Sequence, residues 1–245
     1  FAGSGATAGL NRLVSLLGIE EARDPVVFLG PYEHHSNILP WRESKAKVVE
    51  IPEAHDGGID LDALHRALKE HASSDLKIGS FSAASNVTGI LTDPDPISLL
   101  LHAHGALSIW DYAGGAPYLP IDMGGNGAAR KDAVVVSPHK FPGGPGASGV
   151  LIVNQEAVRR RCPSWPGGGT VSFVSPWSHE YSNDLAAREE AGTPNVIGDI
   201  RAALVCLVKE AVGQAEIEAK EEHFTNMARK SWANNPHLTL LGHPT

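Results

Sequence analysis

The stretch "VVVSPHKFPGGPGASGVLIV", residues 134–153, decides the fold. Each end of it is an unbroken run of Val, Leu and Ile, which is typical of a strand buried on both faces. Between the runs lie "SPHK" (137–140) and a turn rich in glycine and proline. This connection is too short for a helical crossover, so we expect the two strands, 133–137 and 149–153, to pair antiparallel.

Apolar runs of the same kind stand upstream and also predict strands, at 26–30, 47–51, 76–83 and 106–111. Amphipathic segments separate them. One places Leu61, Leu64 and Leu68 at helical spacing, and another, "DPDPISLLLHAHG", begins near a proline and ends in glycine as helices do. This alternation predicts an α/β fold with three layers: a mainly parallel sheet, helices on both faces, and one antiparallel strand.

The amino-acid composition changes downstream of the last predicted strand. Residues 159–184, "RRRCPSWPGGGTVSFVSPWSHEYSND", predict a long loop, and loops of this length are usually functional. Two helices are expected after it, at 196–213 and 215–235.

Charge and cysteine content restrict the function classes. The chain has 20 Lys and Arg against 28 Asp and Glu, a net charge of -8. An acidic chain repels nucleic-acid phosphates and anionic lipids, so neither nucleic acid nor membrane is expected as a partner. The two cysteines fit a cytoplasmic location. Because the sequence lacks an initiator Met and stops at "LTLLGHPT", we interpret it as a fragment.

Lys140 is the first candidate for chemistry. It follows a buried strand, at the edge of a parallel sheet where α/β proteins bind ligands. Desolvation there would lower the pKa of the amine and make it nucleophilic, as Schiff-base formation requires. The equally weighted alternative is an ordinary surface lysine at a strand end.

Asp111 is the second candidate. It closes the strand 106–111 and precedes a flexible Ala-Gly-Gly turn. A carboxylate in this place can pair with a protonated pyridine nitrogen. The alternative is an aspartate that only starts a turn.

The N-terminal "AGSGATAGLNRLV" is the third candidate. Its glycines open a helix whose free N–H groups and dipole suit a phosphate. The same residues fit G-x-G-x-x-A through Gly3, Gly5 and Ala8, so a Rossmann-type NAD(P)-dependent oxidoreductase is the rival hypothesis. A helix start without any ligand is the third possibility.

Two adjacent histidines, His34 and His35, form the fourth candidate. Neighbouring side chains on a helix do not face one site, and no His or carboxylate cluster has zinc spacing, so no metal is expected. Of the cysteines, Cys206 is predicted to be inert core. Cys162 follows three arginines and is a weak candidate nucleophile.

Together these segments resemble the class V aminotransferase family, which includes cysteine desulfurases and selenocysteine lyases. The resemblance rests on the order "GSGAT", "EHHSNILPW", "SNVTG", "WDYAG", "SPHK" and "REEAGTPN", over nearly the whole chain. It implies a fold type I enzyme that uses pyridoxal 5'-phosphate on an amino-acid substrate, as a homodimer. It also implies a large domain over 1–235, with its N-terminal part missing, and the start of a truncated small domain at 236–245.

The resemblance also implies residue roles. Lys140 would hold the cofactor as an aldimine and shuttle a proton at the substrate α-carbon, and Asp111 would pair with the pyridine nitrogen. His34 would stack on the ring, which leaves His35 structural, and Asn86 would lie near the phenolic oxygen. The residues implied at the phosphate are Ala6, Thr7, Ser137 and His139, joined by Thr193 of the neighbouring subunit.

Two departures from the family pattern leave the reaction type open. Gly114 stands where desulfurases usually carry a glutamine that bonds the phenolic oxygen. The family's catalytic cysteine and carboxylate-binding arginine belong to a C-terminal domain absent from this sequence. A remnant that binds the cofactor without turnover is therefore a further alternative.

Overall fold

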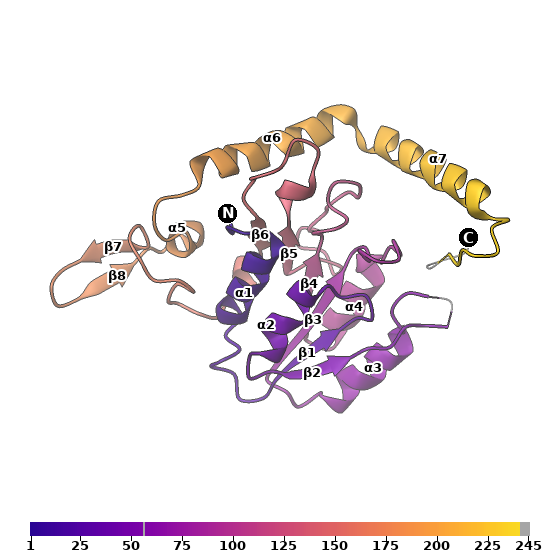
Figure 1. Ribbon diagram of the computed structural model, residues 1–245. Helices are drawn as coiled ribbons and strands as arrows, with labels where there is room; N and C mark the ends of the chain where they lie inside the picture. The colour runs from indigo at the N-terminus through magenta and orange to yellow at the C-terminus, as the bar shows by residue number, and fades with distance from the viewer. Residues whose placement is uncertain (56, 241–245) are drawn as a thin grey trace.

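The computed structural model, which describes residues 1–55 and 57–240, contains a six-stranded sheet with helices on both faces (Figure 1). The strands run in the order β2-β1-β3-β4-β5-β6. Their bounds are β1 (Pro25–Leu29), β2 (Lys47–Glu50), β3 (Leu76–Ser82), β4 (Leu107–Asp111), β5 (Ala133–Val136) and β6 (Val150–Val153). All six coincide with the apolar runs, so the predicted three-layer α/β fold is confirmed.

Strands β1 to β5 pair parallel with their neighbours, and β6 alone pairs antiparallel, with Val136 opposite Val150. The connection from β5 to β6 contains the short 3₁₀ helix η2 (Pro138–Lys140) and turns. The predicted antiparallel pair is therefore confirmed. Because β1, β3, β4 and β5 run the same way, the segments that follow them meet at one edge of the sheet.

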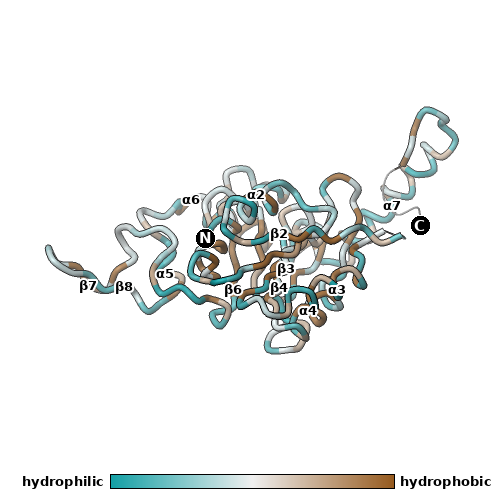
Figure 2. The backbone as a smooth tube through the Cα atoms, turned by 90° about the horizontal axis from the view of Figure 1, so that it is seen from below, coloured by the Kyte–Doolittle hydropathy of each residue, from teal (hydrophilic) through white to brown (hydrophobic). Residues whose placement is uncertain are grey.

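The two faces of the sheet bury alternate side chains of each strand. In β1, Val26 and Phe28 join one apolar core, whereas Val27 and Leu29 join the other. Figure 2 shows these strands as hydrophobic segments in the middle of the molecule. The first core is covered by α3 (Leu61–Glu70) and α4 (Pro94–Ala103), and the second by α1 (Ala6–Leu16) and α2 (Leu39–Arg42).

The expected loop at 159–184 is wrong in part. It contains an antiparallel hairpin of β7 (Val171–Val174) and β8 (His179–Tyr181), which projects away from the sheet, and α5 (Leu185–Glu189) follows (Figure 1). Ser175 N–H donates to the Ser178 carbonyl across the turn at 2.7 Å. The β-branched and aromatic side chains on both sides of this turn favour strands.

Helices α6 (Val196–Val212) and α7 (Gln214–Trp232) confirm the two predicted helices. The stripe that α6 buries consists of Gly198, Ala202 and Val205. Cys206 lies beside this stripe and is exposed, so its assignment to the core was wrong. Leu61 is also exposed, at 42%, because it begins α3 directly after the Asp60 cap.

The interpretation of a large domain over 1–235 and the start of a small domain at 236–245 stays a prediction. Residues 236–240 have no helix or strand, and residues 241–245 of the expected small domain lie outside the described part. None of the helices in the described part combines the length and apolarity that a membrane span needs.

A close approach of two backbones holds the N-terminal glycine loop beside β6. Gly149 N–H donates to Gly3 O, and Gly149 O accepts from Ala2 N, both at 2.8 Å. A Cβ on Gly149 would lie 2.4 Å from Gly5 Cα. The start of α1 is therefore set by a position that only glycine fits.

We expect Gly149→Ala to destabilise the protein by about 1–3 kcal/mol, because one of the two backbones must move. Thermal unfolding measures the effect. Gly168→Ala is the matched control, because nothing lies within 4 Å of a Cβ there. Equal melting temperatures for the two variants would show that this contact does not fix the loop.

Candidate functional site

Three predicted catalytic residues converge at the carboxyl edge of the sheet. His34 lies in the segment after β1, Asp111 ends β4, and Lys140 lies in η2 after β5. The positive charge of Lys140 acts on both of the other groups: it adds to the effect of burial, which lowers the pKa of His34, and opposes the effect of burial, which raises the pKa of Asp111. The three side chains therefore share one electrostatic environment, although long stretches of sequence separate them.

Asp111 presents a carboxylate that is 4% exposed. Burial raises its pKa, whereas a hydrogen bond from Ala113 N–H to Oδ1, at 2.7 Å, and the charge of Lys140 lower it. Among the described residues, Ala113 is the hydrogen-bond donor to this carboxylate, which leaves Oδ2 for a cationic partner. A protonated pyridine nitrogen fits this requirement.

The N-terminus of α1 lies against the segment that follows β5. Ala6 N–H donates to Ser137 Oγ at 3.0 Å. Gly5 has φ +77°, and a Cβ there would lie 2.6 Å from His139 Cε1. Ala6, Ser137 and His139 are thus brought together at the positive end of an 11-residue helix, an arrangement that suits a phosphate.

A chain of hydroxyl groups joins this helix end to His34. Thr7 Oγ1 donates to Ser36 Oγ at 2.8 Å, and Ser36 Oγ lies 3.0 Å from His34 Nδ1. Ser36 N–H donates to the same nitrogen at 3.2 Å, so Nδ1 carries the lone pair. Partial burial, followed by the charges of His35 and Lys140, lowers the pKa of His34, which favours a neutral ring.

Other predicted site residues are more exposed to solvent. Asn86 and Thr193 are exposed, and within the described residues neither side chain makes a hydrogen bond. His139 and Lys140 are exposed as well. The desolvated setting expected for Lys140 is therefore not what the described residues provide, because η2 projects beyond the end of β5.

Comparison with known proteins identifies the family. The model of the family described as aminotransferase class-V matches residues 3–245. The chain belongs to the aminotransferase class-V family.

Individual relatives agree with the family match. The chain is 31% identical to a cysteine desulfurase from Escherichia coli O127:H6, over 98% of this chain and 58% of the relative. It is 28% identical to a probable cysteine desulfurase from Halalkalibacterium halodurans, over 97% and 58%. The chain thus spans less than two thirds of the length of these relatives.

Solved structures give the same fold. The crystal structure of the cysteine desulfurase CsdA from Escherichia coli matches with a TM-score of 0.81 at 25% identity, over 96% of this chain and 58% of that one. The apo cysteine desulfurase from Thermococcus onnurineus matches with a TM-score of 0.79 at 26% identity, over 94% and 56%. The rival Rossmann hypothesis gains no support, because the family model that matches is that of aminotransferase class-V and these structures are cysteine desulfurases.

Sequence reasoning missed a buried polar network in this class-V chain. Its members come from "EHHSNILPW" (33–41), where only the histidines drew attention. Asn37 Nδ2 donates to Glu33 Oε2 at 2.6 Å, and Trp41 Nε1 donates to Asn37 Oδ1 at 3.0 Å. Ser82, at the end of β3, donates to Glu33 through its N–H and its hydroxyl. The spacing of Glu, Asn and Trp at i, i+4 and i+8 was the available signal.

Glu33 is the strongly perturbed group of this network. Burial raises its pKa to about 7, the three hydrogen bonds from Ser82 and Asn37 oppose that shift, and the negative charge of Asp111 adds to it. The perturbed carboxyl group lies in the segment that carries His34.

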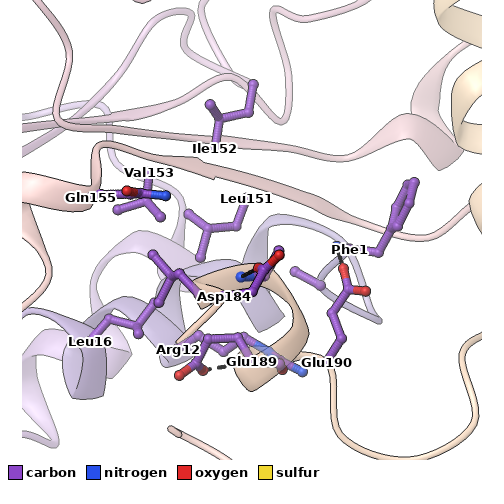
Figure 3. Close-up of a pocket in the computed structure, with 13 residues that line it drawn as sticks. Phe1, Arg12, Leu16, Leu151, Ile152, Val153, Gln155, Asp184, Glu189 and Glu190 are labelled. Carbon is purple, nitrogen blue, oxygen red and sulfur yellow. Dashed lines mark hydrogen bonds and ion pairs between the residues drawn. The ribbon is translucent and has the colours of Figure 1, made fainter. Parts of the chain in front are cut away.

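A separate cavity of about 320 Å³ lies between α1, β6 and α5 (Figure 3). Its acidic residues have structural partners: Asp184 caps α5, and Glu189 accepts hydrogen bonds from Ser164 and faces Arg12. None of the predicted site residues lines this cavity, and we assign it no function. Within the described residues, no three His, Cys, Asp or Glu side chains gather as metal ligands.

The raised pKa of Glu33 predicts a pH-dependent stability. The folded state binds this proton more tightly than the unfolded state, so the contribution is complete below about pH 4.5 and is lost as the pH rises through about 7. Relative to Glu33→Gln, the wild type should lose up to about 3 kcal/mol of unfolding free energy across this window. Denaturant titrations at several pH values measure it.

Ser80→Ala is the control, because it removes a neutral hydrogen bond from the same network and should shift the stability by the same amount at every pH. A wild-type profile parallel to that of Glu33→Gln between pH 4.5 and 7 would contradict the assignment.

Proposed function

We propose that this protein is a pyridoxal-phosphate-dependent enzyme that acts on an amino acid and holds its cofactor through Lys140. The proposal rests on one observation: Lys140, His34 and Asp111 converge at the carboxyl edge of the sheet. A lysine, a neutral ring and a buried carboxylate are the groups that a pyridoxal ring requires for anchoring, stacking and pairing. Membership of the class-V family supports the same cofactor.

Each residue then has a defined task. When bound, pyridoxal phosphate supplies an electron sink for the α-carbon of an amino acid. Asp111 holds a proton on the pyridine nitrogen by offering the negative charge next to it. His34 covers one face of the ring, and the Nζ of Lys140 removes and returns the proton at the α-carbon.

The phosphate end is assigned to Ala6, Thr7, Ser137 and His139. The N–H groups at the start of α1 and the helix dipole bind the dianion, while the hydroxyl groups orient it. Asn86 is proposed near the phenolic oxygen, and Thr193 at the phosphate of a partner subunit.

Cysteine is the proposed substrate, and removal of its sulfur is the proposed reaction. The support is that the relatives are described as cysteine desulfurases. Cys162 and Cys206 are both free and exposed, and we assign neither of them the sulfur-accepting role. A cofactor-binding protein without turnover remains the alternative.

A homodimer is proposed as the working form. Helix α6 exposes apolar side chains on the face opposite its buried stripe, and a contiguous apolar surface of this kind marks an interaction site. Its members include Ile197, Ile200, Leu204, Leu207 and Val208. The proposed location is cytoplasmic, in keeping with two unpaired cysteines.

Lys140 provides the direct test of the cofactor. Purified full-length protein should be yellow, and borohydride should attach the cofactor irreversibly to the peptide that contains Lys140, as read by mass spectrometry. Lys140→Ala should abolish both the attachment and the turnover of cysteine. A full-length protein that takes up no pyridoxal phosphate would contradict the proposal, whereas uptake without turnover would favour the alternative.

The two histidines should behave unequally. His34→Ala removes the proposed stacking ring, so we expect the cofactor dissociation constant to rise by about tenfold, a loss near 1.4 kcal/mol that is typical of a ring stack. His35→Ala is the matched neighbour and should leave the cofactor affinity nearly unchanged. Fluorescence titration with pyridoxal phosphate distinguishes them, and a larger loss in His35→Ala would reverse the assignment.

A further inference from the structure

In the hydrogen-bond network around Glu33, the donor and the acceptor of each bond are fixed. Trp41 Nε1 and Ser80 Oγ both donate to Asn37 Oδ1, at 3.0 and 2.6 Å. The amide oxygen of Asn37 is thereby committed, and its nitrogen must point to Glu33, 2.6 Å away. The network therefore requires an acceptor at position 33, and a carboxylate meets this requirement.

The other end of the network lies beside Asp111. Ser82 donates to Glu33 through N–H at 2.9 Å and through Oγ at 2.7 Å. In the pairing of β3 with β4, Ser82 is the register partner of Asp111. Neighbouring strands lie about 4.8 Å apart, so the serine that holds the Glu33 carboxylate lies directly beside Asp111.

We propose that Glu33 is a positioning residue of the active site, which fixes the His34 segment to the end of β3 and holds a second carboxylate beside Asp111 as a coupled pair. This inference rests on the proposed function, because its consequence is the response of the pair to the cofactor. As a positioning residue, Glu33 touches no reacting atom. It acts through His34 and Asp111.

The coupling follows from the charges. Two carboxylates held close in a poorly hydrated site resist ionising together, so they titrate as a pair. The negative charge of Asp111 indeed raises the pKa of Glu33. A cation that pairs with Asp111 cancels this repulsion, so the pKa of Glu33 falls and part of the Glu33 population releases its proton to the solvent.

The other titratable groups near Glu33 are paired with each other, hydrogen-bonded elsewhere, neutral, or act through Asp111. Arg42 and Glu50 line the cavity beside Glu33 and form an ion pair with each other. Tyr32, the preceding residue, is hydrogen-bonded to Glu53. His34, the following residue, has a lowered pKa and favours its neutral form. Lys140 acts on the pair through Asp111. Asp111 is therefore the charge that couples most directly to Glu33.

The first experiment needs no cofactor. In the full-length apoprotein, isotope-edited infrared spectroscopy with ¹³C-labelled glutamate follows the carboxyl band of Glu33, identified by its loss in Glu33→Gln. Asp111→Asn removes the neighbouring charge and should shift the titration of Glu33 to lower pH. Ser80→Ala, which removes one hydrogen bond and no charge, should leave the coupling to Asp111 in place. If the Glu33 band titrates at the same pH in Asp111→Asn as in the wild type, the inference is overturned.

The second experiment measures protons during loading. Calorimetry of pyridoxal phosphate binding near pH 7, in two buffers of different ionisation enthalpy, gives the number of protons released. Wild type and Ser80→Ala should release a fraction of a proton more than Glu33→Gln, with half a proton as the upper bound, since a group with a pKa near the working pH is half protonated and burial still raises its pKa. Glu33→Gln also disturbs the hydrogen bonds at position 33, and Ser80→Ala is the control because it disturbs the same network and keeps the charge.

The outcomes separate the two proposals. If wild type binds no pyridoxal phosphate, the proposed function fails, while the titration of the apoprotein still decides the coupling. If wild type binds the cofactor and Glu33→Gln releases the same number of protons as Ser80→Ala, the proposed function stands and the role of Glu33 is overturned. Greater proton release from Ser80→Ala than from Glu33→Gln is the expected result.

Discussion

The parallel register of β3 against β4 is the constraint on which the site depends. It sets Ser82 beside Asp111 at the carboxyl edge, and Ser82 in turn holds Glu33. Side chains alternate between the faces of a strand, so a slip of one residue would exchange the faces of every side chain in β4. Buried Ile109 and Trp110, which belong to opposite cores, prevent such a slip because each fits only its own layer. The packing of two apolar cores thus fixes the place of a carboxylate.

Burying two carboxylates at one edge works against stability, and the structure offsets this in different ways. Among the residues that the structure describes, Glu33 accepts three hydrogen bonds, from Ser82 and Asn37, whereas Asp111 accepts one, from Ala113. An incompletely satisfied buried charge is costly unless a partner arrives. The imbalance is what a ligand-binding carboxylate needs: Glu33 is satisfied by the protein itself, and Asp111 is left to pair with something else.

The fold was predictable because its signals are local. Unbroken apolar runs located all six strands of the main sheet, and the short glycine-rich connection after Lys140 gave the direction of β6. The hairpin at Val171–Tyr181 was missed, because the glycine, proline and serine around it outweighed a few strand-forming residues. Cys206 was wrongly assigned to the core because α6 buries small residues and exposes large apolar ones. An apolar helix is usually expected to bury its large side chains. At the site, strand ends made Asp111 and Lys140 candidates, and the family resemblance selected His34, but Glu33 depends on a partner in β3 that no local pattern reveals.

The contrast between His34 and His35 illustrates this limit in physical terms. Their rings stack on each other, with centroids 3.8 Å apart, so neither sequence spacing nor simple proximity separates them. The difference comes from contacts made by other segments. Ser36 fixes the Nδ1 lone pair of His34, Thr7 from α1 donates to that same serine, and Lys140 from η2 lowers the pKa of the ring. His34 is thus oriented by Ser36 and Thr7, and its neutral form is favoured first by burial and then by the charges of His35 and Lys140, while the His35 ring is exposed. A flat, neutral ring of fixed orientation is suited to stacking on another aromatic ring, since a protonated or rotating imidazole would present charge or an edge instead.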